Sequence, residues 1–233
     1  MSSINLASPD KAYIRRIFDS IAFRYDFLNS LLSFQLDQGW RKKSLDLVLE
    51  PEHQSILDLG VGTGKFLQLF LKAKSWKQAI GLDFSSRMLQ SARKALPENV
   101  ELISADFHEI PLKSASIDLI VSAFTLRSVK DMPGFLKEVY RLLAENGKAA
   151  FLCLTRPRNF FWKILYYPYL KFYLPLAGYF FSGDKQAYQF LSKSIQSFQD
   201  PEETAGMMRE AGFQSLEIHS FTWGAATLIA GKK

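Results

Sequence analysis

The sequence predicts an α/β fold in which helices cover both faces of a seven-stranded sheet. Between residues 56 and 154, short apolar runs alternate with stretches of helical periodicity, which is the pattern of parallel strands joined by crossover helices. A glycine-rich turn directly follows the first apolar run, and two more runs, 215–221 and 225–230, complete the seven strands. With 233 residues, 48% of them hydrophobic and 22% charged, the chain is expected to form a single globular domain, 1–233.

The predicted domain has four consecutive parts. Residues 1–50 are expected to form a helical lid with a break near Ser33, residues 51–154 the α/β core, 155–199 an insert, and 200–233 a last helix with two strands. Asp200 is the expected N-cap of that last helix, with Pro201 at its first position. The earlier strands are expected at 56–59, 78–82, 100–104, 119–123 and 148–154, and the helices at 63–74, 85–96, 133–143 and 201–212.

Composition restricts the cellular setting. The one cysteine, Cys153, excludes an intramolecular disulfide and suits a reducing compartment. Residues 1–10 lack the basic and apolar regions of a signal peptide, so we expect a cytoplasmic protein. The net charge of +6 is compatible with nucleic acid or with an anionic membrane surface as a partner.

Three glycines in five positions, Gly60, Gly62 and Gly64, follow the first strand and indicate a tight turn around a ligand. Without a Cβ the backbone can approach a phosphate or a nucleoside closely, and the next helix would direct its first N–H groups at that ligand. The spacing excludes a dinucleotide fingerprint, because Lys65 occupies the place of its third glycine. It also excludes a P-loop, because Phe66 stands where Ser or Thr is required.

An acidic residue ends the second predicted strand. Asp83 lies 19 residues after Gly64, the length that one helix and one strand require. A carboxylate in this place can accept hydrogen bonds from both hydroxyls of a ribose. The pattern therefore predicts a ligand that contains a nucleoside.

Residues 57–64 and 81–85 resemble the glycine loop and the strand-two acid of the S-adenosylmethionine-dependent methyltransferases. This resemblance implies their Rossmann-like seven-stranded sheet, S-adenosylmethionine as methyl donor, and no metal. It also implies that Asp106 meets the adenine amino group and that Phe107 packs on the ring, although a solvated turn is the alternative for Asp106. The implied cofactor-binding residues are Asp58, Gly60, Gly62, Thr63, Asp83, Phe84, Asp106, Phe107 and Ala123.

Residues 18–29, Leu126-Arg127 and residues 183–195 resemble a narrower group, the quinone-biosynthesis C-methyltransferases, which methylate the ring of menaquinone and ubiquinone precursors. Ser128 stands where this family usually has asparagine, Ala123 where serine is frequent, and residues 153–155 depart from its usual Glu-Phe-Ser. The resemblance implies that Tyr25, Asn29, Arg127, Ser128 and Tyr188 contact the substrate and that Arg127 and Asp26 serve catalysis. The alternatives are helix capping for Asp26 and Asn29, and a surface salt bridge for Arg127.

The insert is aromatic and basic. Eleven of the 22 residues from 160 to 181 are aromatic, and residues 155–194 carry six basic side chains against one acid. No uncharged run reaches the roughly 20 residues of a membrane span. Core packing, a cover over an apolar substrate and a membrane-surface element are the three interpretations, and aromatic rings mixed with Lys and Arg favour the last two. We therefore expect an aromatic helical insert that associates peripherally with the inner face of the cytoplasmic membrane.

The resemblance implies methylation of a polyprenyl quinol ring, with demethylmenaquinol as the first candidate substrate. The ubiquinone precursor 2-polyprenyl-6-methoxy-benzoquinol, both substrates together, or a non-catalytic S-adenosylmethionine-binding role are the alternatives. An RNA methyltransferase is disfavoured, because residues 124–127 lack an Asn/Asp-Pro-Pro-Tyr/Phe signature, so no nucleic-acid partner is expected. His108 and Asp26 are the candidate general bases. The sequence leaves the choice between them and the oligomeric state open.

Overall fold

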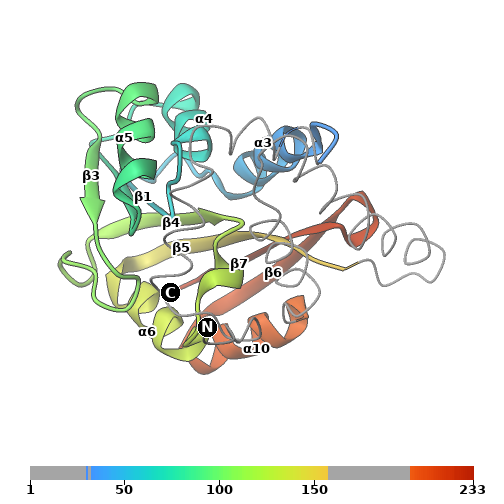
Figure 1. The fold of residues 1–233 in the computed structure, drawn as a ribbon. Helices are drawn as coiled ribbons and strands as arrows, with labels where there is room; N and C mark the ends of the chain where they lie inside the picture. Colours follow the sequence, from blue (N-terminus) through green and yellow to red (C-terminus); the bar gives the residue numbers. More distant parts are fainter. Residues whose placement is uncertain (1–29, 31–32, 157–199) are drawn as a thin grey trace, which may run out of the picture.

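The computed structural model describes residues 30, 33–156 and 200–233, which form the predicted α/β fold (Figure 1). Seven strands make one sheet in the order β3-β2-β1-β4-β5-β7-β6. The first part of the lid and most of the insert, residues 1–29, 31–32 and 157–199, lie outside the described residues. The seven-stranded sheet is confirmed, whereas the helical character of the insert stays a prediction.

All neighbouring strands pair in parallel except β7, which is antiparallel to both β5 and β6. The chain adds β2 and β3 on one side of β1 and then crosses to β4 on its other side. Open α/β sheets bind ligands at such a point, outside the carboxyl ends of the strands. The strands are β1 (Ser55–Leu59), β2 (Gln78–Asp83), β3 (Glu101–Ser104), β4 (Ile117–Ala123), β5 (Leu143–Leu154), β6 (Gln214–Phe221) and β7 (Ala226–Lys232).

Helices cover both faces of the sheet, so the central strands are buried on both sides and consist of nearly continuous apolar runs (Figure 1). Helices α3 (Leu36–Val48), α4 (Lys65–Ala73) and α5 (Ser86–Ala95) pack on one face, around Phe70. Helices α6 (Met132–Leu142) and α10 (Pro201–Glu210) pack on the other, around Phe135 and Phe151. None of the helices in the described part of the chain is long and apolar enough to span a bilayer.

Two predicted boundaries differ from the structure because of local backbone conformation. Helix α4 begins at Lys65 rather than at Thr63, since Gly62 and Gly64 have φ angles of 55° and 88°, which a right-handed helix does not admit. Strand β5 begins at Leu143 rather than at residue 148. Its pairing with β4 shifts in register between these two positions, where Asn146 has a φ of 63°.

The described part of the lid consists of a turn and helix α3. The predicted break near Ser33 is present, because Phe34 and Gln35 adopt left-handed backbone conformations just before the helix. The indole N–H of Trp40 donates a hydrogen bond of 2.8 Å to the hydroxyl of Thr222, in the short 3-10 helix η3 (Thr222–Gly224) between β6 and β7. This bond fixes α3 beside the carboxyl ends of the central strands.

Candidate active site

A cleft opens at the carboxyl ends of β1, β2 and β4. It has a volume of about 610 Å³, including the open solvent at its mouth. The glycine loop after β1, the ends of β2 and β4, and helix α3 contribute to its lining. Eight of the nine predicted cofactor-binding residues line it, namely Asp58, Gly60, Gly62, Thr63, Asp83, Phe84, Phe107 and Ala123. The fold therefore brings these eight residues together at one cleft, although they are spread over 66 positions of the sequence.

The glycine loop is held by its own N–H groups. The N–H groups of Gly60 and Val61 both donate to the carbonyl of Leu82, at 2.8 and 2.9 Å, and the N–H of Gly64 donates to the carbonyl of Val61 at 2.9 Å. These bonds fold the loop over the end of β2.

Asp83 joins the glycine loop to the next helix. One carboxylate oxygen accepts a hydrogen bond of 3.0 Å from the N–H of Gly62, and the other accepts one of 2.9 Å from the N–H of Ser85. Ser85 in turn accepts a hydrogen bond from Met88 as the N-cap of α5. Asp83 also lines the cleft, where a ligand can reach its carboxylate, and the predicted contact with a ribose diol stays a prediction.

An aromatic wall stands beside Asp83. The rings of Phe84 and Phe107 meet edge to face, with centroids 6.3 Å apart and planes at 88°. Phe107 also contacts Phe135 of α6 at 6.0 Å, which connects it to the apolar core. The two rings therefore offer a fixed apolar surface of the kind on which a nucleobase packs.

Asp106 is the one predicted cofactor residue that does not line the cleft. Its carboxylate accepts a hydrogen bond from the backbone N–H of His108 and lies 2.8 Å from the Nδ1 of the same histidine. The Nε2 of His108 lies 3.1 Å from the carbonyl oxygen of Asp131. Both ring nitrogens of this candidate base thus contact protein groups, and His108 does not line the cleft either.

Asp58 is a buried acid at the floor of the cleft. The residue is 1% exposed, and neither carboxylate oxygen has a hydrogen-bond partner among the described residues. Burial raises the pKa of Asp58 to about 7, and the charge of Arg41 and the backbone N–H of Leu67 oppose this rise. The charge of Asp83 adds to the rise. The carboxyl group consequently changes its charge near neutral pH.

Arg41 is a cleft residue that we did not predict. It projects from α3 and is 7% exposed, and its guanidinium lies over the rings of Phe124 and Phe66, 4.9 and 5.8 Å from their centroids. Its Nε is 3.8 Å from Asp37 and makes no hydrogen bond. The sequence did contain a signal for it: Asp37 and Arg41 form a charged pair four residues apart, on the helical face of Trp40, where burial is expected.

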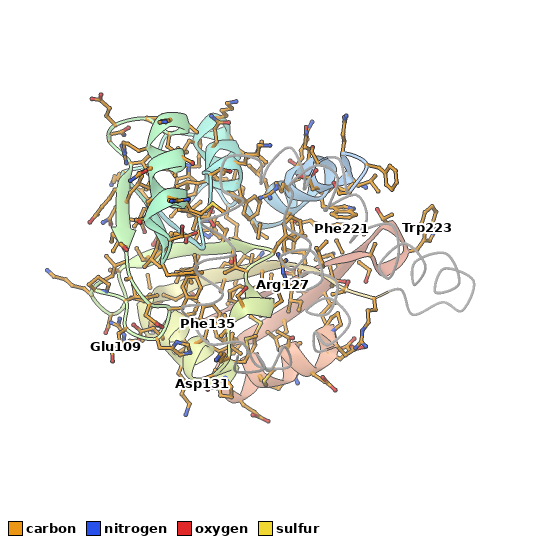
Figure 2. All side chains as sticks on the ribbon, in the orientation of Figure 1. Glu109, Arg127, Asp131, Phe135, Phe221 and Trp223 are labelled. Atoms are coloured by element: carbon orange, nitrogen blue, oxygen red, sulfur yellow. The ribbon has the colours of Figure 1, made fainter. Side chains whose placement is uncertain are left out.

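Arg127 and Ser128 lie in the short 3-10 helix η1 (Leu126–Ser128), just beyond β4. Ser128 lines the cleft, while Arg127 lies near the middle of the molecule (Figure 2). The Nε and Nη1 atoms of Arg127 and the hydroxyl of Ser128 are buried without hydrogen-bond partners among the described residues. Burial raises the pKa of the Cys153 thiol to about 12, and the charge of Arg127 opposes that rise. Buried guanidinium atoms are not expected of a surface salt bridge, the alternative that we considered for Arg127, and its role stays a prediction.

Four predicted substrate or catalytic residues, Tyr25, Asp26, Asn29 and Tyr188, lie outside the described residues, so their roles stay predictions. Within the described ranges, no three His, Cys, Asp or Glu side chains gather as a metal site.

The cleft fits the cofactor that the resemblance implies. A Cβ built on Gly62 would meet no atom closer than 3.9 Å, so the space beside this glycine is not filled by protein. The buried oxygens of Asp58 lack a donor, which a ligand ammonium would supply. Asp83 and the aromatic wall of Phe84 and Phe107 provide the surroundings of a nucleoside. S-adenosylmethionine combines such a nucleoside with an amino-acid group.

Comparisons with known proteins agree with this geometry. Residues 7–233 match the model of the ubiE/COQ5 methyltransferase family. The demethylmenaquinone methyltransferase of Thermotoga maritima is 40% identical over 88% of this chain and 89% of its own length. The enzyme of the same name from Staphylococcus aureus is 34% identical over 96% of this chain and 94% of its own.

Solved structures share the fold at lower identity. An S-adenosylmethionine-dependent methyltransferase from Thermotoga maritima superposes with a TM-score of 0.69 at 23% identity, covering 94% of this chain and 98% of that one. The methyltransferase bound to the Trm112 activator of Haloferax volcanii gives a TM-score of 0.67 at 18% identity, covering 92% and 96%.

The first prediction concerns Asp83. S-adenosylhomocysteine should raise the melting temperature of the wild type, because a ligand that binds the native state stabilises it. Asp83→Ala should remove most of this shift, since the ribose would lose its acceptor. Differential scanning fluorimetry measures the shift, with Glu101→Ala on the exposed part of β3 as the control. A full shift in Asp83→Ala would show that the ribose assignment is wrong.

The second prediction follows from the raised pKa of Asp58. The unfolded chain loses this proton near pH 4 and the folded chain near pH 7, so the contribution of Asp58 to stability declines between these values and stays low above them. The free energy of unfolding of Asp58→Asn, relative to wild type, should therefore rise by about 2 kcal/mol from pH 5 to pH 8. Urea denaturation without ligand measures it. Asp46→Asn, on the exposed side of α3, should show no such trend, and a flat difference for Asp58→Asn would contradict the buried charge.

Proposed function

The chain belongs to the ubiE/COQ5 methyltransferase family, and on this premise we propose that it transfers a methyl group from S-adenosylmethionine to a ring carbon of a polyprenyl quinol. Demethylmenaquinol, which would give menaquinol, is the proposed substrate. The observation that carries this choice is the match of nearly the whole chain to two relatives called demethylmenaquinone methyltransferase.

The buried groups around η1 support a phenolic substrate. S-adenosylmethionine, when bound, supplies a methyl group that is already activated on a sulfonium. The protein has to hold the quinol, exclude water and make the ring carbon electron-rich. A phenol with a pKa of about 10 becomes electron-rich when it loses its proton. The planar guanidinium of Arg127 has buried donors without partners, so it can hold the resulting oxyanion or an ordered water that takes the proton.

The hydroxyl of Ser128 can contribute a further polar contact. It lines the cleft beside Ala123, and its oxygen is buried and unpartnered. A hydroxyl both donates and accepts, so it can replace one hydrogen bond of the family's usual asparagine at a shorter reach. The substitution of serine is therefore compatible with activity.

The ubiquinone precursor 2-polyprenyl-6-methoxy-benzoquinol is the second candidate substrate, because the resemblance in residues 18–29 and 183–195 covers both quinone pathways. Supplying short-tailed forms of both quinols, kept reduced, together with S-adenosylmethionine decides between them. Mass spectrometry should show one added methyl group on demethylmenaquinol. Methylation of the benzoquinol alone would reject the first substrate, and methylation of neither would favour a non-catalytic role.

We further propose that the protein works at the surface of the cytoplasmic membrane. The prenyl tail of the substrate prefers the bilayer, since each buried methylene contributes about 0.8 kcal/mol. An enzyme that docks on the leaflet admits the quinol head without extracting this tail. Attraction of about 1 kcal/mol per basic side chain near an anionic surface makes such docking reversible and salt-sensitive. The basic, aromatic residues of the insert, outside the described part of the chain, support this proposal.

The third prediction tests Arg127. Arg127→Ala should lower the rate of methyl transfer by at least 100-fold, about 3 kcal/mol, because the substrate oxygen would lose charge-assisted hydrogen bonds. The affinity for S-adenosylhomocysteine should change less than threefold, about 0.6 kcal/mol, because Arg127 does not line the cofactor cleft. Steady-state kinetics and calorimetry measure the two quantities, with Lys130→Ala on the exposed turn as the control. A parallel loss of cofactor affinity would place Arg127 in the cofactor site instead.

The fourth prediction tests membrane docking by co-sedimentation with vesicles. The wild type should bind anionic vesicles but not neutral ones. Replacing Lys163 and Lys171 with Glu should weaken the binding without abolishing turnover of a short-tailed quinol. The matched double variant Lys72→Glu, Lys94→Glu changes the net charge equally on α4 and α5 and should bind like the wild type. Equal binding by both double variants would leave docking by the insert without support.

A further inference from the structure

Helix α3 brings a buried cation to the cleft, and nothing in the family resemblance assigned it a role. Arg41 lines the cleft although the residue is only 7% exposed, and its Nε has no hydrogen-bond partner. Asp37 lies 3.8 Å from this Nε, too far for a hydrogen bond, so a buried donor stays unsatisfied in the protein alone. A ligand anion would satisfy it.

Asp58 lines the same cleft as Arg41 and narrows the class of ligand. The charge of Arg41 acts on the carboxyl group of Asp58, but neither oxygen of Asp58 accepts a hydrogen bond from Arg41. The cleft thus presents a cation and an acid that influence each other and share no hydrogen bond. An α-amino acid carries both complementary groups on one carbon, an ammonium for the acid and a carboxylate for the cation.

From these observations we propose that Arg41 binds the carboxylate of the methionine part of S-adenosylmethionine, while Asp58 faces the ammonium. The inference rests on the proposed use of this cofactor and adds a residue of the lid to its site. A quinol oxygen fits Arg41 less well, because Asp58 would lie beside the developing negative charge. A phosphate fits less well for the same reason, with Asp83 as a second acid in the cleft.

The surroundings of Arg41 fix its guanidinium for such a contact. Its central carbon lies 4.9 Å from the centroid of the Phe124 ring and 5.8 Å from that of Phe66 in α4. Asp37, one turn earlier, is 3% exposed, accepts a hydrogen bond of 2.9 Å from the hydroxyl of Ser33, and stands 3.8 Å from the Nε. The two rings and Asp37 therefore hold Arg41 on its Nε side. The terminal Nη atoms of its guanidinium can donate to a planar carboxylate.

The experiment compares two ligands that differ in the amino-acid group. S-adenosylhomocysteine carries the carboxylate and ammonium, whereas 5′-methylthioadenosine has the nucleoside and sulfur without them. Calorimetry should show that Arg41→Met weakens S-adenosylhomocysteine by about 10- to 100-fold, the range of a charge-assisted contact. The same change should alter the affinity for 5′-methylthioadenosine less than threefold, about 0.6 kcal/mol.

Two further variants separate binding from folding. Arg41→Lys keeps the charge and the stem, so it should retain part of the preference for S-adenosylhomocysteine even if Arg41→Met folds poorly. Lys42→Met, the next residue on the exposed side of α3, should leave both affinities unchanged. A preference in Arg41→Lys and Arg41→Met equal to that of the wild type would overturn the proposal, and so would an equal loss for both ligands.

The proposed cofactor use fails in a different way. If the wild type binds neither S-adenosylhomocysteine nor 5′-methylthioadenosine, the cofactor assignment is wrong, and the role of Arg41 falls with it. If the wild type binds both ligands equally, the cofactor's nucleoside is recognised but Arg41 does not contact the carboxylate. Only tight binding of S-adenosylhomocysteine that depends on Arg41 supports the proposal.

Discussion

The hydrogen bond between the Asp83 carboxylate and the N–H of Gly62 is the contact on which the geometry of the site depends. It connects the end of β2 to the glycine loop after β1, so the loop takes its shape only when both strands are paired in register. The second oxygen of Asp83 reaches the N–H of Ser85, which starts α5. One carboxylate thus positions a loop and a helix as well as facing the cleft. A substitution here changes the shape of the site together with its chemistry.

The site concentrates buried polar atoms that lack partners. Asp58, Arg41 and Arg127 all have buried side-chain atoms without a hydrogen bond among the described residues, while the core on either side of the sheet is apolar. Each such group destabilises the ligand-free protein, because buried polar atoms lose the hydrogen bonds of water. Proteins retain such unsatisfied groups at ligand-binding sites, because a bound ligand supplies the missing hydrogen bond. Four of the five described residues with such atoms, Arg41, Asp58, Arg127 and Ser128, lie in or next to the cleft, and His53 is the exception.

Local pattern was sufficient to predict the sheet and most of the cleft. Gly60, Gly62 and Asp83 could be found because a tight turn and a strand end restrict the residue types that fit. Arg41 was missed because its role depends on where α3 packs, which the hydrogen bond between Trp40 and Thr222 determines across 182 positions of sequence. Asp106 was placed in the cleft by resemblance, yet its carboxylate contacts His108. The periodicity of apolar residues predicts helices and strands, but it does not predict long-range packing or the direction of a side chain.

Helix α3 changes how the lid should be understood. The lid was expected to supply substrate and catalytic residues, but its described helix also contributes Arg41 to the cleft that the cofactor residues line. The cation on the lid, Arg41, attracts a carboxylate, and the acid on the central strand β1, Asp58, attracts an ammonium. A zwitterion that carries both groups therefore fits this pair better than a ligand with only one charge. Arginine suits this position better than lysine, because its planar group can stack on Phe124 and still direct donors outward, whereas an ammonium would require full hydration or a closer acid. The bound cofactor would then contact both α3 and β1. A change that displaces α3 would therefore also weaken cofactor binding.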